Sequence, residues 1–170
     1  NGKDFSGSVF KNTIFEDMNI TNSKFLGVQF YNATFKNSNI INSDFSGSAI
    51  DASDFIGGDL ENSKFKNVRG DNVSFKESSL HNTDFSYFTM EEVSFINVDL
   101  RTSIFDHSSI EQSKFINSNL NGLLIYDSEL RDISFENSDV VKLKIDDSLL
   151  RKITFDKNSN VSDDLRYQIY

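Results

Sequence analysis

Large apolar residues recur at every fifth position along almost the whole chain. They occupy the multiples of five from Phe5 to Tyr170, and only Gly70 and Asn160 depart from the pattern. A period of five fits neither an amphipathic helix, whose apolar face recurs at 3.6 residues, nor a strand, whose faces alternate at two. A short repeat of fixed length is typical of a solenoid. The pattern therefore predicts a chain that winds into stacked coils.

A second set of inward positions lies two residues before the large ones. These positions favour small side chains: Ser23, Ala33, Ser38, Ser43, Ser48, Ser53, Ser63, Ser103, Ser108, Ser113 and Ser118. One small and one large inward residue in every five, with three outward, predicts a corner at each repeat. We expect the serine hydroxyls to lie inside, bonded to the backbone, and not to act as nucleophiles.

The repeated units have a consistent composition. Three of them read Ser-Asp-Phe-Ser-Gly from Ser43, Ser-Lys-Phe-Lys-Asn from Ser63 and Ser-Asn-Leu-Asn-Gly from Ser118. These motifs resemble the pentapeptide-repeat family, and the resemblance covers about residues 3 to 155. It implies an all-β solenoid, a right-handed quadrilateral parallel β-helix with four pentapeptides in each coil.

Side-chain size supports four repeats per coil independently. Sixteen of the 17 phenylalanines occupy multiples of five. They concentrate on the odd multiples, and the even multiples are mostly aliphatic. With this alternation of period ten, phenylalanine stacks on phenylalanine and aliphatic residues on aliphatic residues only when a coil holds an even number of repeats. Facing walls should then both carry phenylalanine. A column at spacing twenty also alternates in charge, as favourable cross-strand pairs would: Asp4, Lys24, Asp44, Lys64 and Asp84.

Length and register define the domains. At twenty residues per coil, 170 residues give about eight coils, stacked to a rod of roughly 40 Å. We assign residues 1–160 to the β-helix, with Asn160 at a core position where the pattern fails. Residues 161–170 are predicted to form a short helix with Ser162 as its N-cap. Its apolar positions could cap the last coil or pair two chains as a homodimer: Val161, Leu165, Ile169 and Tyr170.

Composition limits the partners. The net charge is −9, which disfavours direct binding of nucleic acid and favours a basic protein partner. The chain contains no cysteine, which excludes disulfides and cysteine-based metal sites and suits a cytoplasmic protein. There is no apolar run long enough to span a membrane.

One predicted surface column is not explained by stability. At spacing twenty, four positions are acidic, with Glu92 beside them: Asp51, Asp71, Glu91 and Glu111. Lys11 lies below them in the same column, and Arg131 and Arg151 lie above. Like charges on adjacent strands are mildly destabilising. The column is either a surface screened by water and salt or a binding site for a basic partner. A second acidic cluster is expected on another wall: Asp106, Asp127, Asp146 and Asp147.

Other short motifs are weaker. Arg69-Gly70-Asp71 spells the tripeptide of integrin ligands, but Gly70 occupies a core position, so we expect the segment to lie flat in the wall. The ring of Phe88 is expected to fill the space beside Gly70. His81 and His107 fall in different columns. We therefore assign no catalytic residue, no cofactor and no metal.

These observations leave three hypotheses for function. The first is a non-enzymatic structural or protein-binding module that presents a rigid acidic surface. The second follows from the resemblance, since several family members are acidic, dimerise through a C-terminal helix and mimic B-form DNA to bind DNA gyrase, which protects bacteria against quinolones. The third, a cell-surface or effector targeting module, rests on the Arg69-Gly70-Asp71 tripeptide and on the lack of an initial methionine.

Overall fold

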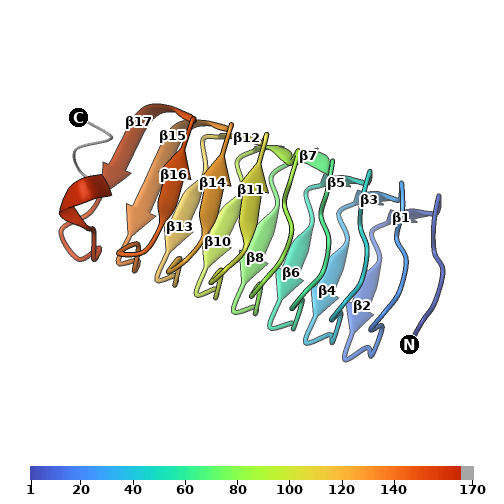
Figure 1. Ribbon diagram of the computed structural model, residues 1–170. Helices are drawn as coiled ribbons and strands as arrows, with labels where there is room; N and C mark the ends of the chain where they lie inside the picture. Colours follow the sequence, from blue (N-terminus) through green and yellow to red (C-terminus); the bar gives the residue numbers. More distant parts are fainter. Residues whose placement is uncertain (166–170) are drawn as a thin grey trace.

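Short parallel strands lie above one another along the walls of a rod, with the two ends of the chain at opposite ends (Figure 1). The structure, a computed structural model, describes residues 1–165. Most strands have three residues, and each pairs with the strand twenty residues away, as in Phe15 opposite Phe35. The quadrilateral coil of four repeats is confirmed.

The first wall carries the outer surface considered below. Its strands are β1 (Val9–Lys11), β3 (Gln29–Tyr31), β5 (Ala49–Asp51), β7 (Arg69–Asp71), β9 (Thr89–Glu91), β12 (Ser109–Glu111) and the first parts of β15 (Glu129–Glu136) and β17 (Leu149–Phe155). The second wall follows along the chain. It consists of β2 (Ile14–Glu16), β4 (Thr34–Lys36), β6 (Asp54–Ile56), β8 (Ser74–Lys76), β10 (Ser94–Ile96), β13 (Lys114–Ile116) and the last parts of β15 and β17.

The other two walls are held mainly by isolated β-bridges. Bridges link Asn19 to Asn39 and continue at spacing twenty on the third wall. The fourth wall begins with the predicted charge column, Asp4 to Lys24 and onward to Asp84. It continues as a sheet of β11 (Ile104–Asp106), β14 (Leu124–Tyr126) and β16 (Lys144–Asp146). From Phe15 to Phe155 the chain makes about seven full turns, against the eight coils expected.

Stacked phenylalanine rings fill the interior. Phe65 and Phe85 stack on the fourth wall with ring centroids 5.3 Å apart, and Phe35 and Phe55 stack on the second wall at 4.8 Å. The two columns meet edge to face across the core, as Phe55 does with Phe65 at 5.7 Å and 81°. Facing walls therefore both carry phenylalanine, as the size alternation predicts. Offset and edge-to-face pairs of this kind add about 0.5–1.5 kcal/mol each beyond burial.

The small inward residues satisfy the backbone at the corners. Ser63 is buried; its hydroxyl accepts a hydrogen bond from the Ser43 N–H (3.1 Å) and donates one to the Ile40 carbonyl (3.0 Å). Ser43 repeats this arrangement one coil below with Ser23 and Ile20. A buried polar group costs little only when it is bonded in this way. The interior position expected for the serines is confirmed.

The last coil contains one extra residue. Phe155 still pairs with Phe135 at spacing twenty, but Asn160 bridges Asp139 at spacing 21. The insertion lies between Phe155 and Ser159, whose hydroxyl accepts the Ser138 N–H at 3.2 Å. Asn160 is therefore exposed, and the expectation that it takes a core position is wrong. Val161 packs against the core in its place.

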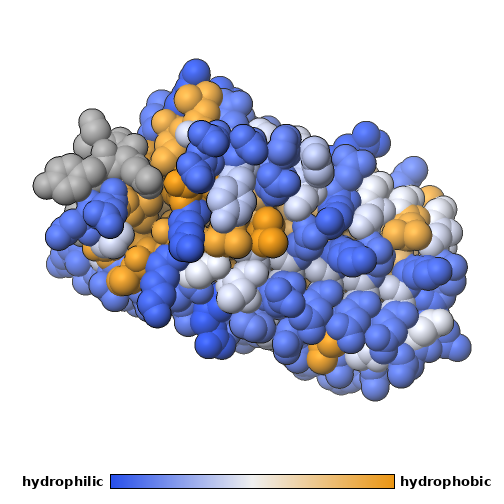
Figure 2. Space-filling model, viewed as in Figure 1, coloured by the Kyte–Doolittle hydropathy of each residue, from blue (hydrophilic) through white to orange (hydrophobic). Residues whose placement is uncertain are grey.

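A helix begins at Asp163 after the inserted coil. The Ser162 hydroxyl accepts the Leu165 N–H at 3.3 Å, which confirms the predicted N-cap. Leu165 is 2% exposed and packs into the core of its own chain. Ile169 and Tyr170 lie outside the described residues, so dimerisation through this segment stays a prediction. Figure 2 shows apolar side chains on the surface near this end of the rod. Val141 and Leu149, in the last coils, are exposed.

Within the described part of the chain, no helix is long and apolar enough to cross a membrane.

Candidate functional site

Four carboxylates lie in register on the first wall. The Cα partners are Asp51 with Asp71, Asp71 with Glu91, and Glu91 with Glu111, on β5, β7, β9 and β12. We call Asp51, Asp71, Glu91 and Glu111 the acidic column. Adjacent parallel strands are about 4.8 Å apart, so each carboxylate is well within a Debye length, about 8 Å at physiological salt, of the next. Their negative potentials therefore add along the wall.

Cations lie at both ends of the acidic column. The Arg131 guanidinium on β15 donates to the Glu111 carboxylate, and this hydrogen bond raises the pKa of Arg131. At the other end, the Lys11 ammonium lies 5.5 Å from the ring centroid of Tyr31, which is the neighbour of Asp51 in register. The column is thus acidic in the middle and basic at its ends, as the spacing predicts.

The three lower carboxylates have no cationic partner among residues 1–165. Asp51 accepts the backbone N–H of Asp71 at 3.2 Å, and Glu91 accepts the side-chain amide of Gln112 at 2.7 Å. These bonds fix carboxylate positions without neutralising their charge. Glu92, at the corner beside Glu91, is exposed and has a left-handed backbone with φ of 55°.

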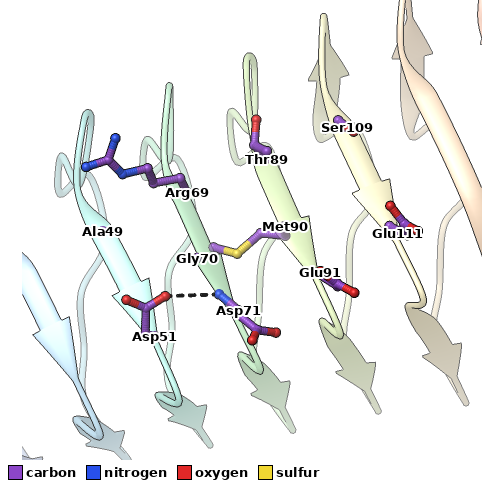
Figure 3. A pocket seen from close by; sticks show the side chains of 10 residues that line it. All are labelled: Ala49, Asp51, Arg69, Gly70, Asp71, Thr89, Met90, Glu91, Ser109 and Glu111. Carbon is purple, nitrogen blue, oxygen red and sulfur yellow. Dashed lines mark hydrogen bonds between the residues drawn. The ribbon is translucent and has the colours of Figure 1, made fainter.

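Beside the acidic column the wall is hollowed at Gly70. Core positions above and below are filled by buried Met90 and Ile50, whereas Gly70 is half-buried. The resulting hollow of about 360 Å³, called here the Gly70 hollow, is drawn in Figure 3. Its lining residues are Ala49, Asp51, Arg69, Gly70, Asp71, Thr89, Met90, Glu91, Ser109 and Glu111.

Only glycine fits the backbone of β7 at this point. A Cβ atom on Gly70 would lie 1.8 Å from the Ile50 carbonyl oxygen, far inside van der Waals contact. In Figure 3 the Met90 side chain extends toward Gly70, and the register places Met90 directly beside it. Phe88 is buried and packs edge to face on Phe85 at 5.1 Å.

The acidic column is predicted by the residue spacing, but the hollow is not. That the ring of Phe88 fills the space beside Gly70 stays a prediction, and the register pairs Met90 with Gly70. The feature of the sequence that could have indicated the hollow is the single glycine, Gly70, at an apolar position of this wall. The Arg69-Gly70-Asp71 tripeptide forms strand β7 within the wall, as expected, and does not project as a loop.

The second acidic cluster is assembled only in part. Asp106, Asp127 and His107 bring their ligand atoms within 4.8 Å of one another. His107 Nδ1 lies 2.8 Å from Asp106 Oδ1, and its ring stacks on Tyr87 at 5.1 Å. Asp146 lies two coils from Asp106, with Tyr126 between them in register. His107 is an addition to this group that the residue spacing does not predict.

Comparison with known proteins identifies the repeat. A family model described as a pentapeptide repeat region matches residues 8–85 and 88–162. None of the curated proteins with which the chain was compared is similar to it.

Several solved structures have a similar fold. HetL from Nostoc sp. strain PCC 7120, a pentapeptide repeat protein involved in heterocyst differentiation regulation, is 10% identical, with 94% of this chain and 88% of HetL covered and a TM-score of 0.45. A trypsin-treated form of QnrB1, a plasmid-mediated fluoroquinolone resistance protein, is 14% identical, with 99% and 94% covered and a TM-score of 0.40. Rfr23 from Cyanothece 51142 is 14% identical, with 88% and 91% covered and a TM-score of 0.31. At these identities the likeness concerns the fold alone.

Proposed function

Because the chain belongs to the pentapeptide repeat family, we propose that it is a non-enzymatic module whose first wall binds a basic protein. The acidic column carries this proposal. Like charges directly opposite on adjacent strands are destabilising. A column of them in register, without cations on its three lower members, is therefore not explained by the stability of the coil.

The wall is suited to recognition because its charges are held in place. Strands β5, β7, β9 and β12 are each hydrogen-bonded to a strand above and one below, so the carboxylates share a rigid backbone. A rigid face loses little conformational entropy on binding. Complementary charge mainly accelerates association and selects the partner. We therefore expect a partner with a row or strip of basic side chains, bound in a salt-dependent manner.

The chemistry of the interior supports a role without catalysis. The serine hydroxyls that repeat along the chain are potential nucleophiles by type, but those of Ser43, Ser63 and Ser103 are buried and donate to backbone carbonyls. A nucleophile needs an adjacent base and access to substrate. These hydroxyls instead hold the coils together.

Charge-neutral substitutions test the proposal. The column variant replaces all four members: Asp51→Asn, Asp71→Asn, Glu91→Gln and Glu111→Gln. The control variant makes the same charge change at acidic residues outside the column: Asp17→Asn, Glu61→Gln, Glu136→Gln and Asp164→Asn. Binding of a short fluorescein-labelled peptide of alternating arginine and serine is measured by anisotropy at low and at physiological ionic strength.

The two variants should behave differently. The column variant is expected to lose about tenfold in affinity or more, because charge pairs at the binding face are removed, whereas the control variant keeps most of it. Equal losses would show that net charge alone attracts the peptide and would overturn the proposal. The proposal would also be overturned if neither variant lost affinity for the peptide. Circular dichroism of both variants verifies that the coil is intact.

Two assays address the other classes of function. The family resemblance also implies DNA gyrase as a partner, and a supercoiling assay with a large excess of this protein tests that alternative. Inhibition that disappears in the column variant would identify gyrase as the basic partner, and unaffected supercoiling would exclude it. Turnover of common hydrolase or transferase substrates, abolished by changing a surface acid, would contradict the non-enzymatic role.

A further inference from the structure

Building on the proposed function, we infer that the Gly70 hollow receives the guanidinium group of an arginine from the basic partner. The acidic column alone would attract any cation. The hollow adds a shape, because the wall is indented at Gly70 beside the carboxylates. The combination favours one inserted side chain over a diffuse contact between two charged surfaces.

The size of the hollow suits a long side chain. A volume of about 360 Å³ corresponds to on the order of ten water molecules at about 30 Å³ each. That space admits the stem and head of one arginine together with some water. Buried Met90 lies beside Gly70 in register. Its thioether is polarisable and adaptable, and the methylene stem of an arginine packs well on apolar surface.

The lining of the hollow matches a guanidinium. Figure 3 shows Asp51, Asp71, Glu91 and Glu111 along one edge, with Thr89 and Ser109 along the other. A guanidinium has five N–H donors in a planar fork, which can donate paired hydrogen bonds to carboxylate oxygens. Asp51 already accepts the Asp71 N–H through Oδ1, which holds this carboxylate in position. Its second oxygen is available to a ligand.

Arginine fits better than lysine for two reasons. The carboxylates are spread along several strands, and a planar fork can bond two of them at once, whereas an ammonium is a compact point charge. A guanidinium is also less strongly hydrated, so it enters a partly enclosed site at a lower desolvation cost. Arg69 lines the same hollow and extends toward Ala49 in Figure 3. Its charge should weaken the binding of a second cation.

Small model compounds test the hollow separately from the whole face. The intact protein is titrated with N-acetylarginine amide, and amide chemical shifts are followed by NMR. N-acetylcitrulline amide, which has nearly the same shape without charge, is the matched ligand control. We expect saturable shifts at Gly70, Asp71 and Met90 with the arginine compound. The citrulline compound should bind at least about tenfold more weakly, since charge-assisted bonds are lost.

A matched pair of variants separates shape from charge. Ala49→Leu places a larger side chain in the hollow, and Gln29→Leu introduces the same apolar residue one coil below, outside it. Neither alters the net charge. The first should abolish the saturable shifts, and the second should leave them intact. Arg69→Gln should increase affinity, about threefold, by removing a competing cation.

The outcomes distinguish this inference from the proposed function. Weak shifts spread over all surface carboxylates, or binding that survives Ala49→Leu, would overturn insertion into the hollow. If the labelled peptide still requires the acidic column in that case, the proposed function stands without an anchoring arginine. If the arginine compound fills the hollow but the affinity for the labelled peptide does not depend on the acidic column, the hollow is a local site and the first wall is not the binding face. Equal binding of the citrulline compound would exclude recognition of charge.

Discussion

At the scale of single residues, each corner requires a left-handed backbone. The residue two positions after a core residue has positive φ in nearly every repeat, with Lys142 and Lys157 as exceptions, and asparagine holds many of these places, such as Asn42, Asn62 and Asn82. Asparagine tolerates this conformation and bonds locally. The Asn82 amide also donates to the Asn62 side-chain oxygen one coil below at 2.6 Å. The same conformation is less favourable where other residue types occupy the corner.

Thr102 is the clearest unfavourable corner. It has φ of 59° between Asn82 and Gly122 in the same column, and β-branched residues rarely adopt this conformation. Thr102→Asn is expected to raise the free energy of unfolding by about 0.5–1 kcal/mol, because asparagine accepts the left-handed region more readily. Urea denaturation measures the change. Thr34→Asn, in strand β4, is the control and should be destabilising. A less stable Thr102→Asn protein would contradict this account of the corners.

The buried serines should be needed for their hydroxyl groups. Ser63→Ala leaves the Ser43 N–H and the Ile40 carbonyl without this partner, and the expected loss of stability is about 1–3 kcal/mol. Ser63→Thr keeps the hydroxyl and should cost less, because Thr83 occupies the same position one coil above. Thermal unfolding of both variants measures the difference. Equal losses would show that volume, not hydrogen bonding, controls this position.

Two aspartates should respond to pH in opposite directions. Burial raises the pKa of Asp54. Burial also acts to raise the pKa of Asp84, but hydrogen bonds from Lys66 and Ser86 outweigh it and lower that pKa below its usual value. The lowered pKa of Asp84 contributes stability above the unfolded pKa, about 3.9, which is lost as pH falls through the folded pKa. The raised pKa of Asp54 is instead a cost that grows as pH rises through it.

Asparagine substitutions test these signs. Asp84→Asn should destabilise the protein at neutral pH, with a difference that shrinks as pH falls from the unfolded pKa, about 3.9, through the lower folded pKa of this carboxylate. Asp54→Asn should be neutral or stabilising at neutral pH, and its difference from the unmodified protein should also fade in acid. Urea midpoints across this range provide the measurement. A destabilising Asp54→Asn with the pH profile of Asp84→Asn would refute the assignment.

At the scale of elements, strands of three residues are stable only through their neighbours. Each strand of the first wall between β1 and β17 is paired above and below, and this chain of contacts includes the unusual strand β7. In such a solenoid, stability is approximately the sum of repeat terms and contacts between adjacent repeats. A defect in one strand should therefore weaken the contacts with the two adjacent coils.

Gly70→Ala should produce this local defect. The new methyl group would meet the Ile50 carbonyl oxygen at 1.8 Å, so β5 and β7 must separate. We expect a loss of at least about 2 kcal/mol, the size seen when a backbone is forced out of its position. Hydrogen exchange should increase first in β5 and β7. Gly47→Asn is the control, because Gly47 has positive φ and open space. Stability equal to that of the unmodified protein would mean that β7 does not need glycine.

Much of this architecture could be predicted from residue spacing. The apolar period of five gives the corners, and the alternation of phenylalanine with aliphatic residues gives four repeats per coil. The extra residue after Phe155 could not be located from the sequence. Polar Asn160 followed by apolar Val161 marks a change of pattern, but no spacing rule shows where the extra residue lies. The Gly70 hollow was missed because spacing places Met90 beside Gly70 but does not determine how its side chain lies there.

At the scale of the whole molecule, function depends on the coil length. The acidic column exists only if residues 51, 71, 91 and 111 return to the same wall after every twenty residues. A different coil length would scatter these carboxylates around the rod, and the Gly70 hollow would no longer lie beside them. The proposed binding face therefore depends on the return of the chain to the same wall after every twenty residues.

Distances between spin labels test that claim most directly. The chain has no cysteine, so Glu16→Cys with Ile96→Cys, and Glu16→Cys with Glu136→Cys, label one outer column of the second wall. At about 4.8 Å per coil, the pairs are four and six coils apart, and pulsed electron paramagnetic resonance should give about 19 and about 29 Å. Distances that do not increase by about 10 Å between the pairs, or a second distance beyond about 45 Å, would contradict a twenty-residue coil.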